Sequence, residues 1–136
     1  MAGDNVFLER VYDEVRAEKH PDQGPEPPPG RRFLVDRLWP RGVSRAAMEG
    51  TTWVKEAGPS PGLRTWFGHD PERFAEFAER YRAELRAHPE VLDPILEAAR
   101  RGPVTLLYSA KDREHNQAVV LREHLRELLS AGPGGN

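Results

Sequence analysis

The 136-residue sequence contains no cysteine, which excludes a disulfide framework, a zinc–thiolate centre and a thiolate nucleophile. It contains no apolar run near the about 18 residues that cross a membrane, and its first residues lack the apolar core of a secretion signal. The glycine-rich loops of dinucleotide-binding and P-loop proteins and the G-x-S-x-G of hydrolases are also missing. These absences predict a cytoplasmic protein with no membrane partner and no bound cofactor.

The sequence also lacks an excess of positive or negative charge. The chain has 20 Lys and Arg against 22 Asp and Glu, a net charge of -2. No global basic field therefore attracts nucleic acid, and an anion site must come from a local cluster. Among the cations, lysine is rare: Lys19, Lys55 and Lys111 stand among 17 arginines. A lysine in such an arginine-rich chain either provides a compact, titratable ammonium that its position needs or has no specific role.

The sequence alternates between strand and helix patterns. Strands are predicted over 6–12, 31–38 and the apolar "PVTLLYSA", which has the continuous burial of a central parallel strand. Ser60 and Pro61 fit the N-cap and first position of a turn of helix over "GLRTWF". An amphipathic helix is predicted over 71–87, and further helices after Val91 and after Asp112, where Asp112 is the expected N-cap. The proline- and glycine-rich residues 13–30 predict a loop, and residues 131–136 a flexible tail.

This alternation predicts a compact, single-domain α/β sandwich over residues 1–130, with a small, mostly parallel sheet flanked by helices. Right-handed crossovers bring the carboxyl ends of parallel strands to one edge of the sheet, where ligands bind in such folds. The stretches "DRLWPRG" and "SAKD" both follow predicted strands, so we expect them on one rim.

The stretch "DRLWPRG" places Asp36, Arg37, Trp39 and Arg41 at a strand exit. Guanidinium groups beside a helix start suit a carboxylate or phosphate, and Asp36 can either act as a base or hold an arginine in place. The alternative is a strand-exit ion pair covered by the indole of Trp39.

Two further stretches carry ionisable groups. "SAKD" supplies Ser109, Lys111 and Asp112, with Asn116 one turn later, and again suits an anion; the alternative is an ordinary strand–turn–helix junction. "LRTWFGHD" supplies Arg64, His69 and Asp70, where His69 is a candidate base and Asp70 before Pro71 fits a helix N-cap. No two histidines are three or four residues apart, so no metal site is predicted.

The stretches "LVDRLWPRG", "WFGHDP" and "VTLLYSAKD", with intervening residues from about Arg10 to Leu125, resemble the DUF488 family in its branch of small stand-alone bacterial proteins. The resemblance implies a compact α/β domain and marks the residues of these stretches as candidate site residues. Because the family is defined by a domain of unknown function, it implies no reaction.

Three hypotheses remain open. The first is a small enzyme for an anionic, phosphate- or nucleotide-like substrate, in which proton transfer falls to Asp36, His69 and Lys111. The second is a non-enzymatic module that binds a nucleotide, a nucleic-acid end or an acidic partner, and the third is a purely structural role for the motifs. For the first two, the expected ligand-binding residues are Arg37, Trp39, Arg41, Arg64, Ser109, Asp112 and Asn116.

Overall fold

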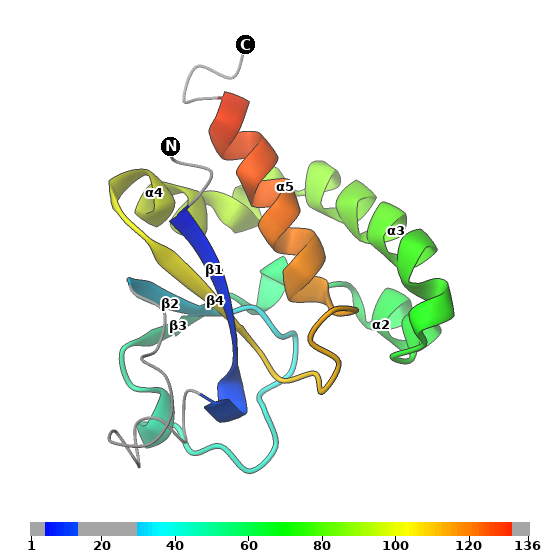
Figure 1. Cartoon of the computed structure of the whole chain (residues 1–136), viewed down its shortest axis with the longest axis horizontal. Coiled ribbons are helices and arrows are strands. Elements are labelled where there is room, and N and C mark those ends of the chain that lie inside the picture. The colour runs from blue at the N-terminus through cyan, green and yellow to red at the C-terminus, as the bar shows by residue number, and fades with distance from the viewer. Residues whose placement is uncertain (1–4, 14–29, 132–136) are drawn as a thin grey trace.

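The computed structural model describes residues 5–13 and 30–131, and it confirms the α/β class (Figure 1). A four-stranded sheet has the order β1-β4-β2-β3, and every neighbouring pair is parallel. The strands are β1 (Val6–Arg10), β2 (Arg31–Leu34), β3 (Thr51–Trp53) and β4 (Val104–Tyr108). The predicted loop over 13–30 and tail over 131–136 lie almost wholly outside the described residues.

The strand β4 is the central strand that its apolar composition predicts. All five of its residues are buried, and it pairs with β1 on one side and β2 on the other. Successive side chains point to opposite faces, so Leu106 and Tyr108 join the larger hydrophobic cluster while Leu107 joins the smaller one. A strand that is buried on both faces needs apolar residues at consecutive positions.

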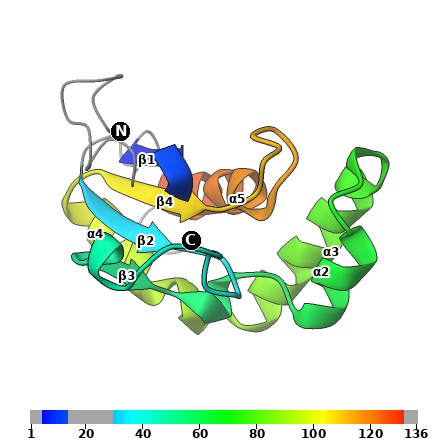
Figure 2. The ribbon, with the colours of Figure 1, turned by 90° about the horizontal axis from the view of Figure 1, so that it is seen from below.

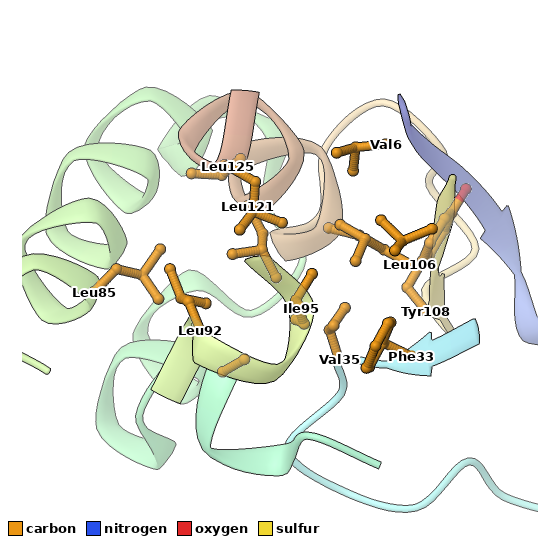
Figure 3. Close-up of a cluster of buried hydrophobic side chains, with 14 of the residues drawn as sticks. Val6, Phe33, Val35, Leu85, Leu92, Ile95, Leu106, Tyr108, Leu121 and Leu125 are labelled. Carbon is orange, nitrogen blue, oxygen red and sulfur yellow. The ribbon is translucent and has the colours of Figure 1, made fainter. Parts of the chain in front are cut away.

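Helices cover one face of the sheet and enclose the larger cluster. Figure 3 shows Leu121 and Leu125 of one helix packed between Leu85 on another and Leu106 on the sheet. The described α-helices are α2 (Pro61–Phe67), α3 (Phe74–Ala87), α4 (Asp93–Arg101) and α5 (Gln117–Ala131). Short 3-10 turns supplement them: η2 (Ala46–Met48), η3 (Lys55–Ala57), η4 (Pro71–Arg73) and η5 (Pro89–Leu92).

Two of the predicted helix starts are capped as expected. The Ser60 hydroxyl accepts from the N–H of Leu63 at the start of α2, and the Asp70 carboxylate accepts from the N–H of Glu72. The helix predicted over 71–87 begins as the 3-10 turn η4 and becomes α-helical at Phe74.

The cap of the last helix differs from the prediction. Asn116, not Asp112, caps α5: its Oδ1 accepts from the N–H of Val119 at 3.1 Å. Asp112 instead accepts from the N–H groups of Glu114 and His115 in the preceding turn. Asp and Asn side chains can both act as an N-cap. Because Asp112 closes a separate turn, the helix starts four residues later than predicted.

Two strand ends also differ from the prediction. The strand expected over 6–12 ends at Arg10, after which residues 11–13 turn helical. The strand expected over 31–38 ends at Leu34. The N–H of Val35 still donates to the carbonyl of Leu107. After it, the N–H of Ser109 donates to the side-chain carboxylate of Asp36, which replaces the next main-chain acceptor of the strand. Figure 2 shows β2 and β4 pointing toward the end of the molecule where α2 meets α3.

Candidate functional site

A cavity of about 550 Å³ opens at the carboxyl edge of the sheet. Its walls come from the ends of β1, β2 and β4, from α2 and from the first residues of α5. All three residues predicted for proton transfer line it: Asp36, His69 and Lys111. Five of the seven predicted ligand-binding residues also line it: Arg37, Trp39, Arg41, Arg64 and Ser109. The parallel topology thus brings segments more than 70 residues apart into one wall.

The remaining two predicted ligand-binding residues lie outside the cavity wall. Asn116 is 1 % exposed, and besides capping α5 it donates from Nδ2 to the carbonyl of Asp112 at 2.8 Å. The Asp112 carboxylate also pairs with the Nδ1 atom of His115 at 2.9 Å. Hydrogen bonds within the turn lower the pKa of Asp112, and the largest contribution comes from the N–H of Glu114. Both side chains therefore build the turn that precedes α5.

Asp36 forms the buried floor of the cavity. Its Oδ2 accepts from the N–H of Ser109 at 3.1 Å and from the Ser109 hydroxyl at 2.5 Å, and its Oδ1 accepts from Nε2 of Gln117 at 2.5 Å. The side chain is 7 % exposed, and this burial raises the pKa of Asp36. The three hydrogen bonds and the charge of Arg64 act in the opposite direction, but burial is the larger effect.

Two tryptophans fix the loop that follows Asp36. The indole N–H of Trp53 donates to the carbonyl of Asp36 at 2.8 Å, and that of Trp39 donates to the carbonyl of Val43 at 2.6 Å. The two rings meet edge to face, with centroids 5.3 Å apart, and the guanidinium of Arg45 lies 4.0 Å from the centre of the Trp39 ring. The loop is therefore held in one conformation at both ends.

The first strand contributes a further support. The Tyr12 hydroxyl donates to the carbonyl of Arg41 at 2.8 Å, and Nε of Arg10 donates to the carbonyl of Ala110 at 3.0 Å. Both side chains line the cavity, and the Arg10 guanidinium lies over the Tyr12 ring. They tie the loops after β2 and β4 to the end of β1.

Arg37 is largely committed to its own chain. Its Nε donates to the carbonyl of Pro59 at 3.2 Å, its Nη2 to that of Gly58 at 3.0 Å, and its Nη1 pairs with Glu56 at 3.2 Å. These contacts hold the segment between β3 and α2 and match the structural hypothesis for this one residue.

Three other cations of the cavity have no such partner. Arg41, Arg64 and Lys111 are exposed, and within residues 5–13 and 30–131 none of them forms an ion pair. Lys55, the other lysine near a strand end, lies outside the cavity wall, with its ammonium 5.6 Å from the centre of the Trp53 ring.

His69 stands on a strained turn. Its φ is 58°, the one positive φ of a non-glycine residue in the part of the chain that is described. Its ring is exposed at the cavity, 6.2 Å from that of Phe67. Because the neighbouring Asp70 caps the next turn, His69 does not use it as a partner.

Three cavity residues with polar side chains were missed from the sequence: Arg10, Tyr12 and Gln117. Ligands bind at the carboxyl edge of a parallel sheet, and the end of β1 lies at this edge as the ends of β2 and β4 do. The same rule could therefore have found Arg10 and Tyr12. Gln117 carries no such signal, because a glutamine at a helix start is usually a solvated surface residue.

Other kinds of site were searched among the same residues. No group of three or more His, Cys, Asp or Glu side chains in the described ranges is placed to hold a metal ion. None of the described helices is long and apolar enough to span a membrane.

Comparison with known proteins identifies the family. A family model described as the inactive DUF488-N3 subclade matches residues 5–135. The chain belongs to the DUF488 family. It is 40 % identical over 124 residues to the uncharacterised protein YeaO of Escherichia coli, covering 91 % of this chain and 99 % of YeaO. It is 34 % identical over 120 residues to the uncharacterised protein Mb3100c of Mycobacterium bovis, covering 88 % and 92 %. No solved structure gives a significant match.

Proposed function

We propose that this DUF488 protein is a non-enzymatic module that binds a small anionic ligand in the cavity at the carboxyl edge of its sheet. The observation that carries the proposal is the charge of the wall: five cationic side chains face the cavity beside one carboxyl group. The cations are Arg10, Arg37, Arg41, Arg64 and Lys111, and the carboxyl group is that of Asp36.

Three of the cations favour a ligand over a structural role, because within the described residues they form neither an ion pair nor a side-chain hydrogen bond to a carbonyl. Arg41, Arg64 and Lys111 reach the cavity from three different elements, the loop after β2, helix α2 and the loop after β4. A structural cluster would pair its charges internally, whereas a recognition site leaves them for the ligand. Inside a concave wall these charges are screened less than on an open surface.

The polar groups of the floor favour binding over turnover. The one proton of the Ser109 hydroxyl is directed to Asp36, and Asp36 already accepts from three donors. Three of the four lone-pair sites of the Asp36 carboxylate are therefore used within the chain, which leaves at most one to take a proton from a ligand. The word "inactive" in the description of the matching subclade agrees with this proposal.

An enzyme remains the second candidate because one observation favours it. Asp36 is a buried carboxyl group with a raised pKa in the wall of a cavity, which is a common setting for a general acid. In that case Asp36 would exchange protons with the substrate, and His69 or Lys111 would serve as the partner group.

The test is a thermal-shift series with inorganic phosphate, sulfate, sugar phosphates and nucleotides, on the wild type and on Arg41→Ala and Arg64→Ala. A ligand at a hundred times its Kd adds about 2.7 kcal/mol to the free energy of unfolding. For a domain of this size that is a rise in Tm of roughly 8 °C. We expect the shift in the wild type and a smaller one in both variants.

The matched control is Arg101→Ala, which removes an exposed arginine on α4, far from the cavity lining. It should shift like the wild type. Mass analysis of the ligand after incubation separates the two candidates: an unchanged ligand supports the binding module, and a converted one supports the enzyme. No shift with any anion, or an equal shift in all variants, refutes the anion site.

A further inference from the structure

The size of the cavity bears on the class of ligand, given the anion site proposed above. A volume of about 550 Å³ lies within the range of roughly 300–1,000 Å³ that encloses a whole organic molecule. A five-atom phosphate or sulfate would leave most of it empty. The ligand that fits therefore has a body as well as an anionic group.

The wall that would meet this body is partly aromatic. Phe67 of α2 and Phe77 of α3 line the cavity as a stacked pair, with ring centroids 4.2 Å apart. They are 5 % and 1 % exposed, so only the edges of the rings reach the cavity. Leu38 also lines it and is 56 % exposed, one of two exposed large apolar residues among those described. A flat, apolar body would pack against the ring edges and cover Leu38.

The floor selects for hydrogen-bond donors on that body. Because the Ser109 hydroxyl gives its only proton to Asp36, its Oγ can only accept a further hydrogen bond. Gln117 donates one N–H of Nε2 to Asp36 and keeps its carbonyl Oε1 as an acceptor and its second N–H as a donor. The buried carboxylate thus makes Ser109 an acceptor toward the cavity, and Gln117 offers a second acceptor beside it.

We propose that the ligand is a nucleoside monophosphate. Its phosphate would pair with Arg41, Arg64 and Lys111, three cations for a group of charge about -2. Its base would lie along the aromatic wall, with N–H groups donating to Ser109 Oγ and Gln117 Oε1. A phosphorylated phenol or a simple sugar phosphate offers the anion but not the ring N–H donors, so it meets only part of the site.

The same chemistry occurs free in solution and at the 5′-phosphorylated end of a nucleic acid. The net charge of -2 provides no basic track for the rest of a strand. We therefore expect the free mononucleotide to bind at least as tightly as a 5′-phosphorylated dinucleotide, and both are measured.

The experiment is isothermal titration of the full chain with the four 5′-ribonucleoside monophosphates, the four nucleosides, ribose 5-phosphate, inorganic phosphate and a 5′-phosphorylated dinucleotide. We expect at least one monophosphate to bind about tenfold tighter than ribose 5-phosphate, because only its base makes hydrogen bonds to the floor and contacts with the apolar wall. The nucleosides, which lack the anion, should bind weakest.

Two variants test the floor. Ser109→Ala and Gln117→Leu should each weaken the monophosphate about three- to tenfold through one lost hydrogen bond. Ribose 5-phosphate should bind both variants as it binds the wild type. Arg101→Ala is the control that should change neither ligand, and a thermal melt of each variant confirms that it is folded.

The outcomes separate this inference from the proposed function. If ribose 5-phosphate or inorganic phosphate binds as tightly as every monophosphate, the nucleoside is wrong and the anion site stands. If no phosphate compound binds, both are wrong. If the dinucleotide binds tighter than the mononucleotide, the expectation of a free ligand is wrong and a nucleic-acid end is the source of the nucleotide.

Discussion

Replacement of Asp36 by asparagine tests whether burial governs the floor of the cavity. Asparagine has the same shape but no charge, and its single carbonyl oxygen can keep the two bonds from Ser109. Its amide nitrogen would then face Nε2 of Gln117, so the hydrogen bond from Gln117 is lost. The variant therefore keeps the packing and removes the ionisation.

The sign of the expected pH effect follows from the raised pKa. Between the unfolded pKa of Asp, about 3.9, and the higher pKa of folded Asp36, the folded state binds the extra proton. Wild-type stability therefore falls as pH rises through this window, by about 1.4 kcal/mol for each unit between the two pKa values. The Asp36→Asn variant should not show this fall in stability, because its side chain does not ionise. At pH 4 we expect the wild type to be more stable by about 1 kcal/mol, the value of one hydrogen bond.

The assay is urea unfolding of both proteins from pH 4 to pH 8, followed as the difference between their free energies of unfolding. Other titrating groups cancel in this difference between the two free energies of unfolding, which should narrow as pH rises. Glu79→Gln, at an exposed position on α3, is the control for loss of a carboxylate. A difference that widens with pH would refute the reasoning, because it would mean that the hydrogen bonds and the cavity cations outweigh burial.

Further predictions concern the core and one tight turn. Tyr81→Phe removes the buried hydroxyl that donates to the carbonyl of Ala57 and should cost about 1–3 kcal/mol in urea unfolding. Burial lowers the pKa of His124, so stability should fall as pH drops below about 6.5, and His124→Leu should remove that fall. Gly30→Ala should cost more than about 2 kcal/mol, since φ is +95° and a Cβ would lie 2.0 Å from the carbonyl oxygen of Pro103.

Each of these has a direct check. Gly62→Ala is the control for Gly30→Ala, because a Cβ there meets nothing within 4 Å; equal losses in both would contradict the steric argument. A Tyr81→Phe protein as stable as the wild type would mean that water satisfies the carbonyl of Ala57. Acid sensitivity that persists in His124→Leu would assign it to other groups.

Much of the fold follows from local patterns. The apolar run of β4 predicted a central strand, and Ser60 and Asp70 predicted the helix starts that they cap. Two of the three boundaries that were wrong depend on a hydrogen bond made by a side chain. Asp36 takes the N–H of Ser109 and ends a strand, and Asn116 caps the helix for which Asp112 was expected. Two short polar side chains four residues apart look alike in a sequence.

The candidate site divides in the same way. The segments after two strands were predicted to lie together, because the carboxyl ends of parallel strands meet at one edge of the sheet independently of their side chains. This prediction could not say that Arg37 donates to the carbonyls of Gly58 and Pro59, while Arg41 forms no ion pair with the described residues. That distinction depends on where a segment about 20 residues away comes to lie.

The sequence by itself therefore determined the class of fold, the rim and the kind of charge that gathers there, since these depend on period, composition and the handedness of chain crossovers. Only the tertiary structure decided which cations form ion pairs within the described residues, that Gln117 reaches Asp36 across 81 positions, and that Ser109 donates to the same carboxylate. Such contacts join residues that share no local pattern, and only the packing of the whole chain brings them together.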